Sequence, residues 1–194
     1  MKIGLYFGSF NPIHIGHMII ANYIVEHTDI DQLWLVVTPH NPHKNKKSLA
    51  GNHDRLHMVN LAIEGNDKLK ASNIEFNLPK PSYTIDTMTH LKERYPKHEF
   101  SLVMGGDNLA SLPKWKNYER LIENYQIYVY KRPTHEVTDL AEHPNIIMCE
   151  APMLDISSSY IRKFIREKKS IRYLVPDRVY EYLEGETIYN NLQD

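Results

Sequence analysis

Short apolar runs rich in β-branched and aromatic residues recur along the chain and predict buried strands. These runs are residues 3–7, 33–37, 100–104, 127–130 and 146–148. Between them lie segments whose apolar residues are three to four positions apart, such as residues 18–25 and 56–63, and this spacing predicts helices. The alternation predicts an α/β fold of Rossmann-like type, a doubly wound parallel sheet with helices on both faces. Ligands are then expected beyond the carboxyl ends of the strands.

Other segments carry weaker patterns. Residues 38–53 are polar, with prolines and lysines, and are expected to form a long loop over the ligand edge. Residues 155–169 predict a helix opened by serines, and Pro176 predicts the start of a further amphipathic helix. The tail, residues 187–194, is expected to be mobile.

Length and composition are typical of one globular domain. The 194 residues fit a single α/β domain, taken as residues 1–194. A formal net charge of −1 offers no basic surface, so no nucleic-acid partner is expected. No apolar stretch approaches the roughly 20 residues that cross a membrane. The one cysteine, Cys149, and the lack of a signal-peptide pattern indicate a cytoplasmic setting.

The segment with candidate chemistry directly follows the first predicted strand. It reads Gly8-Ser9-Phe10-Asn11-Pro12-Ile13-His14-Ile15-Gly16-His17 and leads into the first predicted helix. Gly8 allows a sharp turn close to a ligand, and free amides at a helix start favour phosphate. His14 and His17 lie on one face of the opening turn and can donate to one anion. The pattern indicates a phosphate-binding site.

A zinc site is the alternative for a chain with 11 histidines. Close pairs also occur at His40 with His43 and at His53 with His57. The usual cysteine ligands and an HExxH motif are missing, which disfavours coordination of a metal. We therefore expect no metal held by the protein alone.

Residues 8–17, GSFNPIHIGH, resemble the GxFxPxHxGH signature of the nucleotidylyltransferase superfamily. The second motif of that superfamily, ISSTxIR, is matched by residues 156–162, ISSSYIR. Alone, this second segment also suits an ordinary helix cap followed by a surface arginine. Two departures are Ser159, where threonine is usual, and Phe7, where a second glycine is common. The resemblance implies an ATP site made of Gly8, Ser9, Phe10, His14, Gly16, His17, Ile156, Ser157, Ser158 and Arg162.

The middle of the chain resembles the bacterial nicotinate mononucleotide adenylyltransferases in particular. Residues 81–87, PSYTIDT, carry this likeness together with the later Gly105-Gly106-Asp107 and Trp115. The resemblance runs from Lys2 to about Tyr182. It implies that nicotinate mononucleotide binds to Ser9, Lys44, Ser82, Tyr83, Thr84, Gly106, Asp107 and Trp115, with Arg55 as a weaker phosphate partner than Lys44.

The residue types suit this assignment on physical grounds. Ser82 can cap a helix whose first amides, at Tyr83 and Thr84, suit a carboxylate better than a neutral amide. A surface helix without a ligand is the alternative. Asp107 follows a buried strand and can hold ribose hydroxyls or cap a turn. Trp115 can offer its ring face to a pyridine or lie partly in the core.

The resemblance implies transfer of AMP from ATP to nicotinate mononucleotide, with release of pyrophosphate and formation of a precursor of NAD. Catalysis would depend on positioning and charge stabilisation by His14, His17, Lys44 and Arg162. Use of ATP implies Mg2+, held mainly by phosphate and water. Phosphopantetheine as the acceptor, or a nucleotide sensor without turnover, are the competing hypotheses. The oligomeric state is open, with a homo-oligomer among the options.

Overall fold

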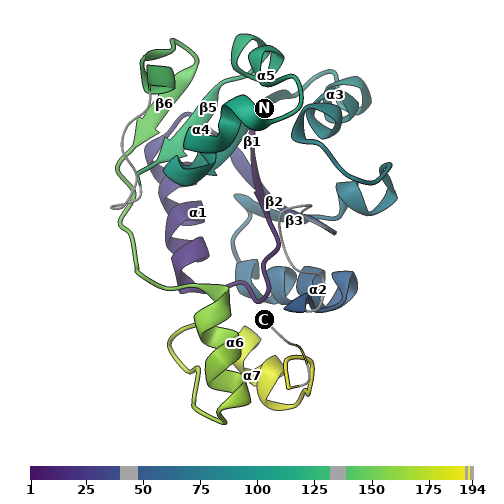
Figure 1. Cartoon of the computed structure of the whole chain (residues 1–194), viewed down its shortest axis with the longest axis vertical. Helices are drawn as coiled ribbons and strands as arrows, with labels where there is room; N and C mark the ends of the chain where they lie inside the picture. The colour runs from purple at the N-terminus through teal and green to yellow at the C-terminus, as the bar shows by residue number, and fades with distance from the viewer. Residues whose placement is uncertain (40–47, 132–138, 191, 193–194) are drawn as a thin grey trace.

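One parallel sheet forms the centre of the protein (Figure 1). The computed structural model describes residues 1–39, 48–131, 139–190 and 192. Within them the strand order is β3-β2-β1-β4-β5-β6, and every neighbouring pair is parallel. The strands are β1 (Lys2–Gly8), β2 (Gln32–Val37), β3 (Leu69–Ser72), β4 (Glu99–Gly105), β5 (Ile127–Tyr130) and β6 (Ile146–Cys149). The predicted doubly wound α/β fold is confirmed.

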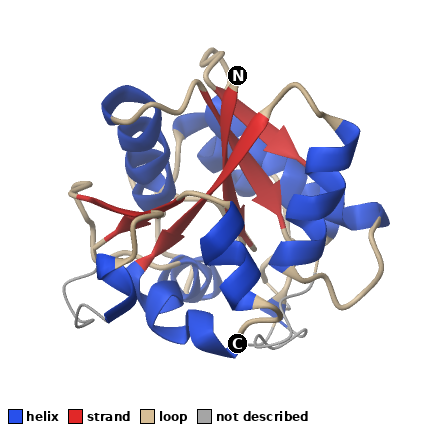
Figure 2. Cartoon of the chain, turned by 90° about the horizontal axis from the view of Figure 1, so that it is seen from above, coloured by secondary structure: helices blue, strands red, loops and turns tan. Residues whose placement is uncertain are grey.

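Helices cover both faces of the sheet (Figure 2). The α-helices are α1 (Ile15–His27), α2 (Asn52–Ile63), α3 (Thr84–Arg94), α4 (Gly106–Ser111), α5 (Tyr118–Asn124), α6 (Ser158–Arg166) and α7 (Asp177–Glu184). Helices α1, α2, α6 and α7 share one hydrophobic core with the sheet, and α3, α4 and α5 share a second. In Figure 1, α6 and α7 lie together at the lower end, beneath α1 and α2.

Successive residues of a strand face opposite sides of the sheet, and this alternation separates the two cores. In β2, Leu33 and Leu35 pack in the core with α1 and α2. Trp34 and Val36 pack on the other face with α3. Both faces are apolar, which explains why the sequence shows continuous apolar runs instead of alternating polar residues.

The sequence did not predict β3, because its residues Leu69–Ser72 form no apolar run. Only Leu69 and Ser72 in this strand are buried. The strand pairs with β2 at the edge of the sheet, where one side of the ladder has no neighbour among the described strands. A short edge strand needs little apolar surface.

The carboxyl-terminal elements differ from the prediction in detail. Helix α6 is shorter than residues 155–169: Ser157 caps it by accepting the Tyr160 amide at 3.2 Å, and Lys168 beyond its end is left-handed, with φ of 54°. Pro176 precedes α7 as its cap. The expected mobility of the tail is wrong for Tyr189, which is 1 % exposed and belongs to the first core.

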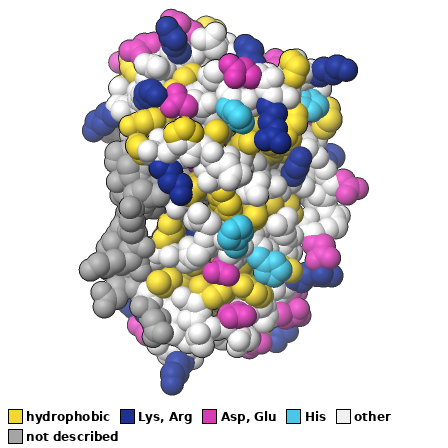
Figure 3. Space-filling view, turned by 90° about the vertical axis from the view of Figure 1, so that its right-hand side faces the viewer, with side chains coloured by type: hydrophobic (Ala, Val, Ile, Leu, Met, Phe, Trp, Pro, Cys, Tyr) yellow, Lys and Arg dark blue, Asp and Glu magenta, His cyan; other side chains and the backbone are white. Residues whose placement is uncertain are grey.

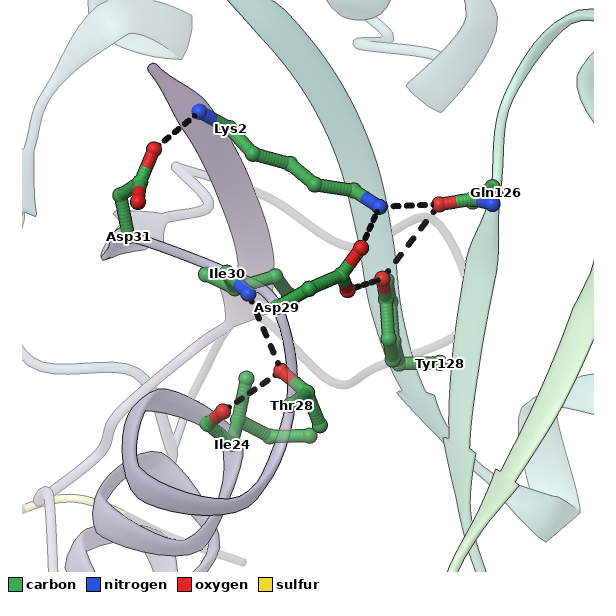
Figure 4. Close-up of polar contacts among 8 residues, drawn as sticks. All are labelled: Lys2, Ile24, Thr28, Asp29, Ile30, Asp31, Gln126 and Tyr128. Atoms are coloured by element: carbon green, nitrogen blue, oxygen red, sulfur yellow. Dashed lines mark hydrogen bonds and ion pairs between the residues drawn. The ribbon is translucent and has the colours of Figure 1, made fainter.

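A polar network joins the amino-terminal ends of β1 and β5 (Figure 4). The Lys2 ammonium contacts both the Asp29 carboxylate and the side-chain oxygen of Gln126, and the Tyr128 hydroxyl donates to Asp29. The bonds from Lys2 and Tyr128 lower the pKa of Asp29. Burial, followed by the bond to Asp29, raises the pKa of Tyr128 to about 12. The network lies at the opposite end of the strands from the expected ligand edge, so we assign it to stability.

We expect Asp29→Asn to lower the free energy of unfolding at pH 7 by up to about 1 kcal/mol, because an exposed ion pair contributes little. The folded-state pKa of Asp29 is below its unfolded value, so its contribution is present above the unfolded pKa and disappears as the pH falls through the folded one. Urea unfolding from pH 7 to pH 3 measures this, with Asp67→Asn as an exposed control. If the free energies of unfolding of Asp29→Asn and of the unmodified protein differ by the same amount from pH 7 down to pH 3, the assignment is contradicted.

Candidate active site

The chain reverses its winding direction between β1 and β4, and this point defines the expected ligand crevice. From β1 the chain passes through α1 to β2 on one side, and from β4 it passes through α4 to β5 on the other. Strands β1 and β4 are neighbours and end at Gly8 and Gly105. In doubly wound sheets, ligands bind at this switch point, beyond the carboxyl ends of the strands. Two candidate segments, residues 8–17 and 105–107, meet there.

The turn after β1 is shaped by Phe10, which has φ of 44° and is 1 % exposed. Its ring folds back over Gly8, so that a Cβ atom on Gly8 would lie 2.7 Å from it. The ring also packs edge-on against Tyr6 and His17, with centroids 5.7 and 5.1 Å away. Glycine is therefore required at position 8 by the close approach of Phe10. Any contact of Phe10 with ATP would use its main chain.

The two histidines of the first motif form a stacked pair at the start of α1. Their ring centroids are 3.7 Å apart with an interplanar angle of 24°. The backbone amide of His14 donates to Nδ1 of His17 at 3.2 Å. Since Nδ1 of His17 is thereby an acceptor, its neutral ring carries the proton on Nε2 and can donate from that atom. The pair thus suits the predicted role as donors to one anion.

The two sequence motifs lie in contact, although about 140 residues separate them along the chain. The Ser158 hydroxyl donates to the carbonyl of Pro12 at 2.9 Å, and the Arg162 guanidinium donates to the carbonyl of Asn11 at 2.8 Å. A Cβ atom on Gly16 would lie 2.9 Å from Ile156. The start of α6 is therefore packed against the start of α1, and the two form one site.

Arg162 points inward, and this differs from a surface arginine after a helix cap. It is 6 % exposed, and besides Asn11 it contacts the Ser159 hydroxyl, with the donor and acceptor atoms 3.0 Å apart. The serine that replaces threonine in the motif thus keeps the hydroxyl that Arg162 uses. A guanidinium carries five N–H donors and a permanent positive charge, and both are suited to phosphate.

The predicted acceptor helix is α3, but its start differs from the prediction. Tyr83 is the cap residue and makes no side-chain capping bond, so the expected cap at Ser82 is wrong. The amides of Asp86 and Thr87 bond to the Tyr83 carbonyl within the first turn. The amide of Thr84, at the first helical position, has no acceptor within its own helix.

Trp115 belongs to a segment that contacts this helix start through the next residue, Lys116. Trp115 is half-buried and packs against the core that contains α3, α4 and α5. The neighbouring Lys116 forms an ion pair with Asp86 at 2.8 Å and lies 4.8 Å above the ring of Tyr83. These contacts hold the Trp115 segment against the start of α3. Lys116 was not among the site residues predicted from the sequence.

The Gly105-Gly106-Asp107 segment ends β4 and begins α4. Gly105 is the cap residue, and Asp107 lies in the first turn. A Cβ atom on Gly105 would lie 2.5 Å from an Asp107 carboxylate oxygen and 3.0 Å from the Tyr130 ring. Glycine at 105 therefore lets the Asp107 carboxylate fold back over the end of β4, at the switch point.

Arg55, suggested by sequence as a phosphate partner, is instead buried within the frame of the site. It is 0 % exposed and donates to the main-chain carbonyls of Ser9, Thr38 and Ala50 at 2.6, 2.9 and 3.0 Å. It also donates to the Asn52 side chain at 2.7 Å. Burial lowers its pKa to about 10, so it stays charged at neutral pH. Lys44, the other basic residue expected here, lies outside the described residues.

A buried acid near the acceptor helix was also missed by the sequence argument. Glu75, in the 3-10 helix Ile74–Asn77, is 2 % exposed and accepts the Thr87 hydroxyl at 2.9 Å. Burial raises the pKa of Glu75. Since Thr87 belongs to the first turn of α3, this bond anchors the helix start to the 3-10 helix that contains Glu75. Its surroundings in the sequence, Ile-Glu-Phe-Asn, show no pattern that marks it.

The charge distribution supports a local phosphate site. On the face in Figure 3, basic and acidic side chains are interspersed among the described residues. Three or more His, Cys, Asp or Glu residues do not gather anywhere in the described part of the chain in a way that could hold a metal. None of the described helices could span a membrane.

A doubly wound sheet with two helix starts facing its switch point defines an α/β nucleotide-binding protein. The family model for cytidylyltransferase-like proteins matches residues 5–164. A probable nicotinate-nucleotide adenylyltransferase from Flavobacterium psychrophilum is 53% identical over 191 residues, 97% of this chain and 99% of that protein. Its counterpart from Bacillus licheniformis is 36% identical, with 97% and 98% covered. The chain belongs to the cytidylyltransferase-like family and, within it, to the nicotinate-nucleotide adenylyltransferases.

Solved structures show the same fold. The nicotinic acid mononucleotide adenylyltransferase of Plasmodium falciparum, complexed with NaAD, superposes with a TM-score of 0.82, 22% identity and 98% coverage of both chains. A putative nicotinate-nucleotide adenylyltransferase from Vibrio parahaemolyticus gives 0.72 and 20%, with 97% of this chain and 95% of that chain covered. The family resemblance seen in the two sequence motifs is thus confirmed.

We expect Gly16→Ala to disrupt the contact between the two motifs. The added Cβ atom would lie 2.9 Å from Ile156 and 3.1 Å from the His14 ring, and overpacking of this kind costs about 1–3 kcal/mol. The melting temperature and the turnover number should both fall. Gly185→Ala is the matched control, because its nearest contact is 3.8 Å away. Equal behaviour of the two variants would show that the motifs are not tightly packed.

Proposed function

We propose that this protein transfers the AMP part of ATP to nicotinate mononucleotide, giving nicotinate adenine dinucleotide and pyrophosphate in NAD biosynthesis. The observation that carries this proposal is the paired arrangement at the switch point. The start of α1, with His14 and His17, joins the start of α6, and the start of α3 lies with Trp115. The starts of α1 and α6 together suit a polyphosphate. The start of α3 together with Trp115 suits an aromatic carboxylate.

The reaction is a direct displacement at phosphorus. An oxygen of the mononucleotide 5′-phosphate forms a bond to the α-phosphorus of ATP, and the bond from that phosphorus to the bridging oxygen breaks. Pyrophosphate leaves with the electron pair of that bond. A side-chain nucleophile is not needed, so the residues contribute by positioning and by stabilising charge.

His17 has the geometry for charge stabilisation. Its Nδ1 atom accepts the His14 amide, so Nε2 is the ring nitrogen that we assign to an α-phosphate oxygen, where it donates as the charge on that oxygen grows. His14 lies parallel to it and donates to the same phosphate. Ser157, Ser158 and Arg162, at the start of α6, hold the β- and γ-phosphates. Lys44 is the further cation that we assign to phosphate.

Mg2+ enters with ATP as part of the substrate complex. It prefers oxygen ligands and keeps several waters, so triphosphate oxygens and water provide most of its coordination. Asp107, whose carboxylate lies at the end of β4, is the one acidic residue among the predicted site residues and suits a bound water or a ribose hydroxyl. Three further points remain predictions: a cytoplasmic setting, one domain over residues 1–194 and a homo-oligomer.

The test is an incubation with ATP, Mg2+ and one acceptor at a time: nicotinate mononucleotide, nicotinamide mononucleotide or phosphopantetheine. Pyrophosphate release should be fastest with nicotinate mononucleotide, and mass spectrometry should find nicotinate adenine dinucleotide. Release only with phosphopantetheine would reassign the acceptor. Binding of ATP without any release would favour a nucleotide sensor.

His17→Ala should lower turnover by about a hundredfold or more while the fold stays intact, as loss of a preorganised donor does. His27→Ala is the matched control, because His27 lies at the far end of α1, where it stacks on Tyr23. Steady-state kinetics and circular dichroism measure both effects. Near-normal turnover in a folded His17→Ala protein would refute the mechanism.

Nicotinate should be preferred to nicotinamide mononucleotide because backbone amides of Tyr83 and Thr84 face the carboxylate. A charged hydrogen bond exceeds a neutral one by roughly 1 kcal/mol, so two bonds give about a tenfold to hundredfold preference. Thr84→Pro removes one amide and should largely abolish the preference. Proline is tolerated at a first helical position, and Tyr83 before it is extended, with φ of −109° and ψ of 138°.

Thr84→Ala is the control for this variant, because it keeps the amide and should erode the preference only partly. The specificity constants for both mononucleotides are compared. Lys116→Gln separates the contribution of the neighbouring cation, which the ion pair with Asp86 holds beside Tyr83. If Thr84→Pro keeps the preference and Lys116→Gln removes it, the side chain is the determinant and the amides are not.

A further inference from the structure

The side chain of Asn11 lies at the centre of a buried set of hydrogen bonds within the first motif. It is 3 % exposed. Its Oδ1 accepts the Ala50 amide and the Tyr189 hydroxyl, each at 3.0 Å, and its Nδ2 donates to the Ser48 carbonyl at 2.7 Å. Because the Ala50 amide can only donate and the Ser48 carbonyl can only accept, these partners fix which way the amide group faces.

The same residue also sets the position of Arg162. The Asn11 carbonyl accepts the Arg162 guanidinium at 2.8 Å, and Pro12 after it accepts Ser158. Asn11 thus holds the turn between β1 and α1 through its side chain and the start of α6 through its main chain. A shift of Asn11 would move the groups that we assign to ATP on both sides.

Tyr189 reaches this point from the other end of the sequence. It lies 178 positions after Asn11 and is 1 % exposed within the core that holds α2, α6 and α7. Burial raises the pKa of Tyr189, and the charges of Arg162 and Arg55 act in the opposite direction. The hydroxyl therefore keeps its proton and is the donor to Asn11. The ring packs in the core, while the hydroxyl points to the turn.

We propose that Tyr189 is a positioning residue for adenylyl transfer, whose hydroxyl acts through Asn11 on the phosphate-binding turn and on Arg162. This inference rests on the proposed function. It makes the tail after α7 part of the active-site framework. The residues that we assign to ATP lie on that framework. Of those assigned to the mononucleotide, Ser9 shares the turn, whereas the start of α3 and Trp115 belong to the opposite core.

Tyr189→Phe tests the proposal, because it removes the hydroxyl and keeps the ring. The expected result is a fall of about 5- to 20-fold in kcat/KM for ATP, with KM for nicotinate mononucleotide changed less than about twofold. The melting temperature should change little. Tyr180→Phe is the matched control: its hydroxyl bonds to Glu184 on α7, away from the turn, and it should behave like the unmodified protein.

A double-mutant cycle separates positioning from a general structural role. In an Asn11→Ala background, Tyr189→Phe should cause no further loss, because the hydroxyl acts through Asn11. Additive losses, an equal fall for both substrates, or unchanged kinetics in Tyr189→Phe would each overturn the proposal. ATP affinity from calorimetry is measured on the same proteins. If the unmodified protein released no pyrophosphate, the proposed function would fail, while ATP affinity would still decide the role of Tyr189.

Discussion

The site depends on one buried cation. Arg55 has lost its hydration, and removal of a guanidinium from water costs several kcal/mol unless its donors find partners. Here the partners are main-chain carbonyls from the turn after β1, the end of β2 and the segment before α2. Carbonyls of separate loops cannot bond to each other, since each is an acceptor. A shared donor group brings them together, and the three loops keep one relative position.

This arrangement leaves the helix starts accessible. A carboxylate could hold these loops through their backbone amides, but an acid near the first motif would repel phosphate. A cation that bonds to carbonyls gives the same rigidity and adds positive charge near an anion site. Asn11 extends the frame with neutral groups, and the stacked histidines stand at its edge. The structure therefore combines rigidity with positive charge within the same few residues.

Much of the fold was predictable because its strands are buried on both faces and show as uninterrupted apolar runs. β3 was not, since an edge strand with two buried residues leaves no such run. The motif residues His14, His17 and Arg162 could be proposed from sequence because helix starts with phosphate donors recur in known families, and the structure brings their two segments into contact. Arg55 and Glu75 could not, because burial decides their role and a charged residue in a helical pattern is normally read as exposed. Tyr189 was hidden for a similar reason: its segment has no periodic pattern, and only tertiary packing orders it.

The bond between Tyr189 and Asn11 also has a consequence for how the protein is made. The turn that it holds leaves the ribosome well before the tyrosine, which follows 178 residues later. A nascent chain can pair β1 with β2 long before it can close this contact. The hydrogen bond that completes the turn therefore forms late, and a chain interrupted before Tyr189 still lacks it even if its sheet has folded.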